Sequence, residues 1–135
     1  QVKIFYYIDD KIDYNLSKLV KNFPNLMVLK VAYLPDIKII EGDSHLWLNP
    51  ENAIIVASDV AEKLTSLDPD NKPYYQNRSS NFNRQTIKNI NFINNLFAKK
   101  ELSKNKDYKH SYLFYHNGYS YFEKYFHLNQ NYYLA

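Results

Sequence analysis

The 135-residue chain contains no cysteine. Disulfides and thiolate metal sites are therefore excluded, so any transition metal would have to be held by imidazole and carboxylate side chains. Glycine is also rare, with two residues, and no glycine-rich phosphate loop is present. Nucleophile–base pairs and paired-carboxylate motifs are likewise missing, and no apolar run reaches the ~18 residues that a membrane-spanning helix needs. We therefore expect neither an enzyme nor a membrane-spanning segment.

Positive charge is modest and dispersed. The net charge is +3, the lysines are scattered, and the only arginines are Arg78 and Arg84. The densest basic run, from Lys99 to His110, contains Ser, Asn and Asp and is typical of a solvated loop. With 45% hydrophobic and 17% aromatic residues, the composition is that of a globular domain, and it does not indicate a nucleic-acid partner.

The first part of the chain alternates between strand and helix patterns. Residues 2–8 and 26–31 are β-branched, apolar and aromatic runs typical of buried strands. Between them, residues 13–23 carry apolar side chains at helical spacing and end at Pro24. This order predicts an α/β fold.

Two helices are predicted next. Asn49 is a favourable N-cap and Pro50 suits the first helical position, so a helix should begin there. Its apolar face is predicted to contain Ala53, Ala57, Val60, Ala61, Leu64 and Leu67. A second helix over residues 73–100 would span roughly 40 Å, which suggests a bridge between two lobes. Beyond it, the pattern predicts a strand over residues 111–115, a helix over 119–126 and a strand from about residue 131.

The four histidines are His45, His110, His116 and His127. His110 lies in the basic loop and His127 after a helix, and both are explained as surface or packed residues and not as ligands. His45 and His116 instead lie at loop-to-helix junctions among apolar and aromatic neighbours. Asp43 is close enough in sequence to orient the His45 ring, as carboxylates do for metal-binding imidazoles. From the residues alone, packing and metal binding remain equally open for this pair.

Two stretches resemble one known family. "DSHLWLNPENAIIVASDVAEKLTSLDPDNKPYYQNRSSNF" and "FYHNGYSYFEKYFHL" are similar to segments of the zinc/manganese ABC-transporter solute-binding proteins. The family patterns are D-P-H-x-W-L-x-P-x-N-A and H-x-A-x-x-Y-F, and they occur here in the family's order and spacing. Ser44 replaces the usual proline, and Asn117 with Gly118 replaces an acidic-alanine pair. The family's histidine-rich acidic loop is missing.

The resemblance implies two α/β lobes joined by a long helix, with a metal held in the cleft between them. Residues 1–72 would form part of the amino-terminal lobe, residues 73–102 the connecting helix and residues 103–135 the start of the carboxy-terminal lobe. It also implies that His45 and His116 are metal ligands. The family has two further ligand positions, an upstream histidine and a downstream acidic residue, which this sequence does not contain. We therefore expect an internal fragment lacking the amino-terminal and carboxy-terminal parts.

The function implied is high-affinity capture of Zn²⁺, with Mn²⁺ as the second choice, for delivery to an ABC transporter membrane permease. We expect a monomer in the periplasm, or an exported, membrane-associated protein in a Gram-positive cell, with no nucleic-acid partner. The alternative is a truncated remnant without metal-transport activity that acts as an interaction module. Its aromatic residues would then form an exposed apolar surface.

Overall fold

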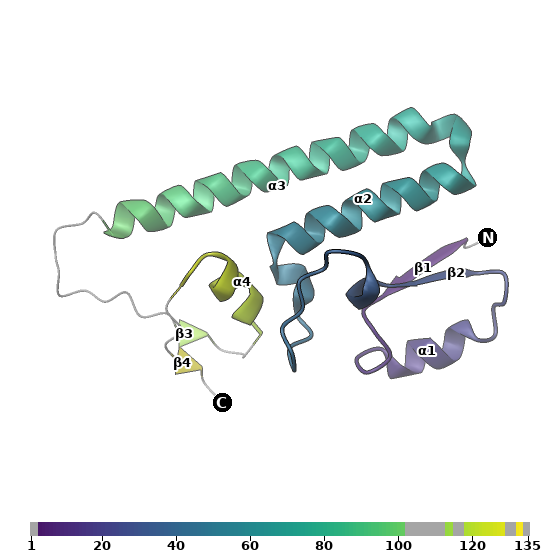
Figure 1. The fold of residues 1–135 in the computed structure, drawn as a ribbon, viewed down its shortest axis with the longest axis horizontal. Helices are drawn as coiled ribbons and strands as arrows, with labels where there is room; N and C mark the ends of the chain where they lie inside the picture. The colour runs from purple at the N-terminus through teal and green to yellow at the C-terminus, as the bar shows by residue number, and fades with distance from the viewer. Residues whose placement is uncertain (1–2, 102–112, 115–117, 129–131, 134–135) are drawn as a thin grey trace.

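The computed structural model describes residues 3–101, 113–114, 118–128 and 132–133 (Figure 1). The strands and helices, in chain order, are β1 (Ile4–Tyr7), α1 (Tyr14–Val20), β2 (Met27–Lys30), α2 (Pro50–Leu67), α3 (Lys72–Glu101), β3 (Leu113–Phe114), α4 (Ser120–Tyr125) and β4 (Tyr132–Tyr133). Three short 3₁₀ turns are η1 (Val31–Tyr33), η2 (Leu46–Leu48) and η3 (Pro69–Asn71).

Parallel strand pairs occur at both ends of the described chain. β1 pairs with β2 from Ile4↔Met27 to Tyr7↔Lys30, and α1 connects the two strands. β3 pairs with β4 in the same parallel sense, with α4 between them in the sequence. Each unit therefore has the strand–helix–strand order that a parallel pair requires. The predicted α/β fold is confirmed.

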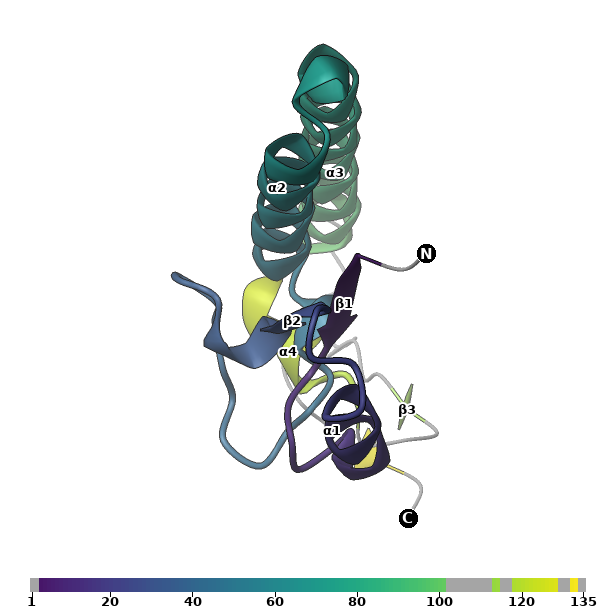
Figure 2. The ribbon, with the colours of Figure 1, turned by 90° about the vertical axis from the view of Figure 1, so that its right-hand side faces the viewer.

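Helices α2 and α3 form an antiparallel pair along the top of the molecule (Figures 1 and 2). The predicted start of α2 is confirmed: Pro50 is its first residue, and the Asn49 side chain accepts a hydrogen bond from the Glu51 amide at 2.9 Å. α3 has 30 residues and matches the long helix predicted over residues 73–100. Leu67, expected on the apolar face of α2, is exposed because it ends the helix where the chain turns into η3.

The hydrophobic core lies below the helical pair and joins segments that are distant in sequence. Its buried centre is formed by Val31 after β2, Leu46 in η2 and Tyr121 in α4. Around these pack partly buried residues of β1 and the position after it, of the loop after β2, of η2 and of α2, namely Tyr6, Ile8, Ala32, Leu34, Ile37, Ile40, Leu48 and Val56. The Tyr6 hydroxyl also donates to Asp59 Oδ2 at 2.8 Å and so ties β1 to α2. The core thus holds the loop after β2 against both α2 and α4.

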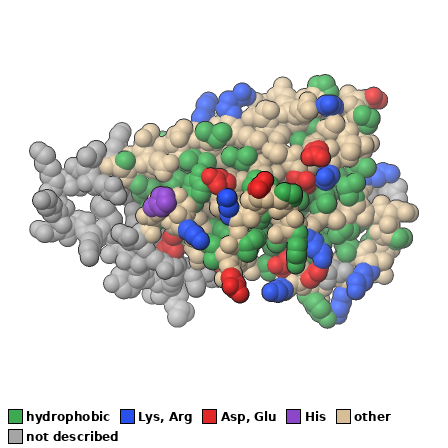
Figure 3. Space-filling view, viewed as in Figure 1, with side chains coloured by type: hydrophobic (Ala, Val, Ile, Leu, Met, Phe, Trp, Pro, Cys, Tyr) green, Lys and Arg blue, Asp and Glu red, His purple; other side chains and the backbone are tan. Residues whose placement is uncertain are grey.

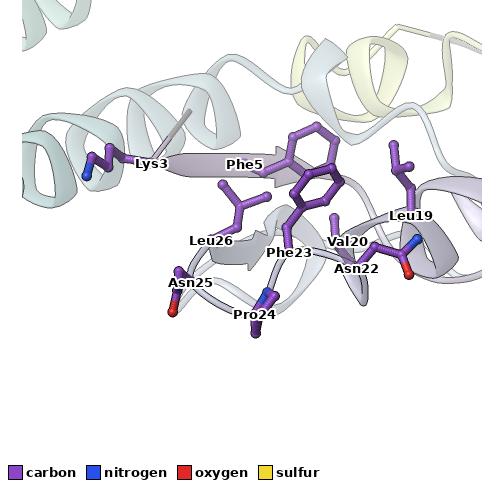
Figure 4. A pocket seen from close by; sticks show the side chains of 9 residues that line it. All are labelled: Lys3, Phe5, Leu19, Val20, Asn22, Phe23, Pro24, Asn25 and Leu26. Atoms are coloured by element: carbon purple, nitrogen blue, oxygen red, sulfur yellow. The ribbon is translucent and has the colours of Figure 1, made fainter. Parts of the chain in front are cut away.

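Two surface features do not single out a binding site. Figure 3 shows acidic, basic and hydrophobic side chains intermixed on one face, without a patch of a single charge sign. A hollow of about 440 Å³ lies beside β1 and the end of α1, and its walls are mostly apolar, including Phe5, Leu19, Phe23 and Leu26 (Figure 4). Among the described residues that line it, Lys3 is the only charged one. None of the helices in the described ranges is long and apolar enough to cross a membrane.

Asn52 fixes the long segment between β2 and α2. Its side chain is fully buried, accepts from the Lys38 amide at 2.8 Å, and donates to the carbonyls of Lys38 (2.9 Å) and Leu46 (2.8 Å). One side chain thus satisfies three backbone groups at the two ends of residues 38–46. Because buried backbone groups need partners, this segment depends on Asn52 for its conformation.

We predict that Asn52→Ala destabilises the protein by about 2–4 kcal/mol. The change leaves the Leu46 carbonyl buried without a partner, at a cost of about 1–3 kcal/mol, and removes the partner of two part-buried backbone groups of Lys38. The free energy of unfolding from urea denaturation measures the effect. Asn89→Ala, at an exposed position of α3, is the matched control and should cost nothing, since alanine favours a helix. Equal stability of Asn52→Ala and the wild type would contradict the assignment.

Candidate metal centre

The candidate site lies at the carboxyl ends of β1 and β2, the edge of a parallel sheet at which ligands commonly bind. A hollow of about 450 Å³ opens there. It is bordered by residues that follow the two strands, by residues 39–44 and by Leu46; His45, between Ser44 and Leu46, does not itself line it. The loop that carries His45 therefore faces this edge.

A tight turn from Ile40 to Asp43 precedes the histidine. The Asp43 amide donates to the Ile40 carbonyl at 3.1 Å, and the two residues form an isolated antiparallel bridge. Gly42 has φ +79°, a backbone angle that residues with a Cβ rarely adopt. A Cβ at this position would meet no atom within 4 Å, so the turn requires glycine for its backbone angle and not for space.

Asp43 orients His45 through two contacts from one oxygen. Its Oδ1 accepts from the His45 amide at 2.9 Å and lies 2.7 Å from His45 Nδ1. An ionised carboxylate can only accept, so the proton of the neutral ring resides on Nδ1 and the lone pair on Nε2. This is the tautomer of an imidazole that binds metal through Nε2, with a carboxylate behind it. The predicted pairing of Asp43 with His45 is confirmed.

The Asp43 carboxyl is well suited to this role. Burial raises the pKa of the Asp43 carboxyl, but hydrogen bonds from the His45 amide and ring lower it by more, and the Ser120 hydroxyl lowers it in addition. The net pKa lies below the ordinary value, so the group is ionised at neutral pH and remains an acceptor. Ser120 is the first residue of α4, so two distant segments act on one carboxylate.

The residues after His45 fix its backbone and ring. His45 precedes η2, whose Leu46 side chain is buried in the core. Trp47 makes an edge contact with the imidazole at 5.3 Å between ring centroids. The His45 side chain is 28% exposed, which leaves it accessible to solvent while its surroundings restrict the ring.

A contact that the sequence pattern does not predict comes from α4. The hydroxyl of Tyr121, a buried side chain, accepts from the Ile40 amide at 2.8 Å and donates to the Asp43 carbonyl at 3.1 Å. Tyr121 thus binds the turn that carries Asp43. Tyr121 and Asn52 both occur in the motif stretches, but neither an aromatic run nor a helix start indicates partners so distant in sequence.

The other histidines separate into two groups. His116, the second predicted ligand, and His110 lie outside the described residues. His127 is exposed just after α4 and has φ +53°, so its surface assignment agrees with the structure. Within the described ranges, no three His, Asp or Glu side chains gather in a group that could hold a metal. The site formed by these ranges is therefore the Asp43–His45 pair.

Comparison with known proteins identifies the family. Residues 1–135 match the family described as "Zinc-uptake complex component A periplasmic". The chain belongs to this family. Its relatives are substrate-binding proteins of metal ABC transporters and not enzymes, as expected.

Among the relatives, the manganese ABC transporter substrate-binding lipoprotein PsaA of Streptococcus mitis is 33% identical over 100 residues, which cover 64% of this chain and 32% of that protein. The metal ABC transporter substrate-binding lipoprotein SsaB of Streptococcus sanguinis is 40% identical over 70 residues, 44% of this chain and 23% of that protein. The chain therefore matches about a third or less of these relatives.

Solved structures show the same fold. The metal-dependent lipoprotein YcdH of Bacillus subtilis matches with a TM-score of 0.74 at 22% identity, over 96% of this chain and 47% of that one. AdcAII of Streptococcus pneumoniae matches with a TM-score of 0.72 at 25% identity, over 96% and 48%. The chain thus corresponds to about half of a solute-binding protein of this fold, and the prediction of a partial fold of this class, with its long helix, is confirmed.

We predict that metal-free His45 is predominantly the Nδ1–H tautomer, and that Asp43→Ala shifts it toward Nε2–H, because the acceptor that retains the proton on Nδ1 is removed. Nitrogen-15 chemical shifts of the imidazole measure the ratio. Asp36→Asn removes a carboxylate from the same loop at a positive φ that asparagine tolerates; it is the control and should leave the shifts unchanged. A wild-type ring already protonated on Nε2 would refute this assignment.

Proposed function

We propose that the protein captures a divalent transition metal, zinc first and manganese second, and delivers it to an ABC transporter permease. The observation that carries the proposal is the 2.7 Å contact between Asp43 Oδ1 and His45 Nδ1 within a family motif. This contact directs the metal-binding lone pair to Nε2 before any metal arrives. The metal is cargo, so the site must bind it and also release it.

We propose His45 and His116 as ligands, each through an imidazole nitrogen. Because the chain lacks cysteine, the donors are nitrogen and oxygen atoms, a set that suits zinc in a tetrahedral site with bonds of roughly 2.0–2.1 Å to nitrogen. The family description names zinc, whereas the S. mitis relative is named for manganese. Imidazole donors support zinc, since manganese favours carboxylate and water oxygen.

We further propose that residues 1–72 belong to one lobe, residues 73–102 to the connecting helix and residues 103–135 to a second lobe, as the resemblance implies. The permease is the proposed partner, and the working form is a monomer. Several relatives are named as lipoproteins, which supports an exported, membrane-attached protein over one free in a periplasm.

A remnant that binds no metal is the second candidate. It is favoured by the absence of any group of three metal-binding side chains within the described ranges. The two candidates differ in one measurable property, the response of the folded protein to zinc.

We predict that zinc raises the melting temperature of the full-length protein, because a ligand that binds only the folded state stabilises it by about 2.7 kcal/mol at 100 times Kd. His45→Ala and His116→Ala should each abolish most of the shift, and manganese should give a smaller one. His127→Asn, which removes an exposed imidazole and tolerates the positive φ, is the control. No zinc shift in the wild type would favour the remnant; a full shift in His45→Ala would exclude this residue as a ligand.

A further inference from the structure

The hydroxyl of Tyr121 has a role that its ring does not explain. The ring is 2% exposed and packs in the core with Val31 and Leu46. A phenylalanine would fill this space equally well. The hydroxyl, however, bonds two backbone groups about 80 positions earlier in the chain, the amide of Ile40 and the carbonyl of Asp43.

These two groups are the ends of the Ile40–Asp43 turn. The turn already uses the Asp43 amide and the Ile40 carbonyl in its own hydrogen bond. The Tyr121 hydroxyl accepts from Ile40 and donates to Asp43, so both ends of the turn are connected to one atom of α4. The position of the Asp43 backbone is thereby set by α4.

Asp43 in turn restrains the His45 imidazole. Its side chain contacts both the amide and Nδ1 of His45, so a displacement of the Asp43 backbone changes the direction of His45 Nε2. A continuous chain of hydrogen bonds therefore runs from α4 through Asp43 to His45. In the sequence Tyr121 lies five positions after His116, so the segment that follows the second proposed ligand positions the first.

We propose that Tyr121 is a positioning residue whose hydroxyl holds the Asp43–His45 pair in its metal-binding orientation and couples it to the α4 segment. The link to metal affinity rests on the proposed function, whereas the link to the orientation of His45 does not. Two measurements therefore test the two links separately. The first measures the orientation of His45, and the second measures the affinity for metal.

The first measurement needs no metal. Tyr121→Phe in the full-length protein should convert the single His45 tautomer into a mixture, visible in the imidazole nitrogen-15 shifts. Tyr7→Phe is the matched control, because Tyr7 is also a buried tyrosine and its hydroxyl bonds an aspartate, Asp10, at 2.7 Å. It should leave His45 unchanged. Unaltered His45 shifts in folded Tyr121→Phe would overturn the proposal even if the protein binds no metal.

The second measurement is zinc affinity, by competition with a chelator. Tyr121→Phe should weaken Kd about 10-fold or more, in line with the roughly 10–100-fold effect of residues that support metal ligands. Tyr7→Phe should remain within about twofold. Equal weakening in both variants would show a general loss of stability and overturn a specific role.

A double-mutant cycle tests the route through Asp43. If Tyr121 acts on His45 by way of Asp43, Tyr121→Phe should weaken zinc binding much less in an Asp43→Ala background than in the wild type. Fully multiplicative effects on Kd would show that the hydroxyl acts independently of Asp43.

Gly42→Ala provides a second variant if Tyr121→Phe does not fold. It strains the same turn without altering the core and should also weaken zinc binding. Wild-type affinity in folded Gly42→Ala would then count against the turn as the link.

Discussion

The candidate site depends on hydrogen bonds to the backbone of residues 38–46, a largely half-buried or exposed segment that has little regular secondary structure. Side chains of α2 and α4 bond this segment at backbone groups that are buried or part-buried, and such groups need partners. Asn52 bonds Lys38 and Leu46 at the ends of the segment, and Tyr121 bonds the turn in its middle. Two buried side chains therefore supply hydrogen bonds that a sheet would otherwise provide. Without them the backbone of the segment would lose its fixed partners, and Asp43 would lose its fixed position.

This constraint has a direct consequence for the proposed binding of metal by His45. A histidine on a free loop must lose ring and backbone freedom when it binds a metal, and that loss weakens affinity. Here the His45 amide and Nδ1 are already bonded by Asp43, Leu46 is anchored in the core and Trp47 contacts the ring edge. Much of the ordering therefore precedes binding. The same preorganisation fixes the direction of approach, because only Nε2 of this tautomer carries a lone pair.

The sequence predicted what local chemistry determines. Apolar periodicity placed the first two strands and the four helices, and the Asn49–Pro50 cap located the start of α2, because these signals act within a few residues. The Asp43–His45 contact could also be predicted from the sequence, since the two residues are two positions apart. The roles of Asn52 and Tyr121 could not be predicted from the sequence. Asn52 occupies a helix start where a polar residue is usually exposed, and Tyr121 is one of several aromatics in "YSYFEKYF"; only tertiary contacts distinguish it. His116 lies outside the described residues and stays a prediction.

The geometry also bears on the choice between zinc and manganese. An oriented imidazole binds zinc more strongly than manganese in the general order of divalent affinities, so His45 by itself favours zinc. A manganese protein that retained this pair would need carboxylate or water oxygens among its remaining donors to offset that preference. The Asp43 oxygen that holds His45 Nδ1 cannot also serve as such a donor without releasing the ring. If His45 is a ligand as proposed, the Asp43–His45 pair favours zinc and sets how rigidly this ligand is presented, and any preference for manganese would have to come from the remaining donors.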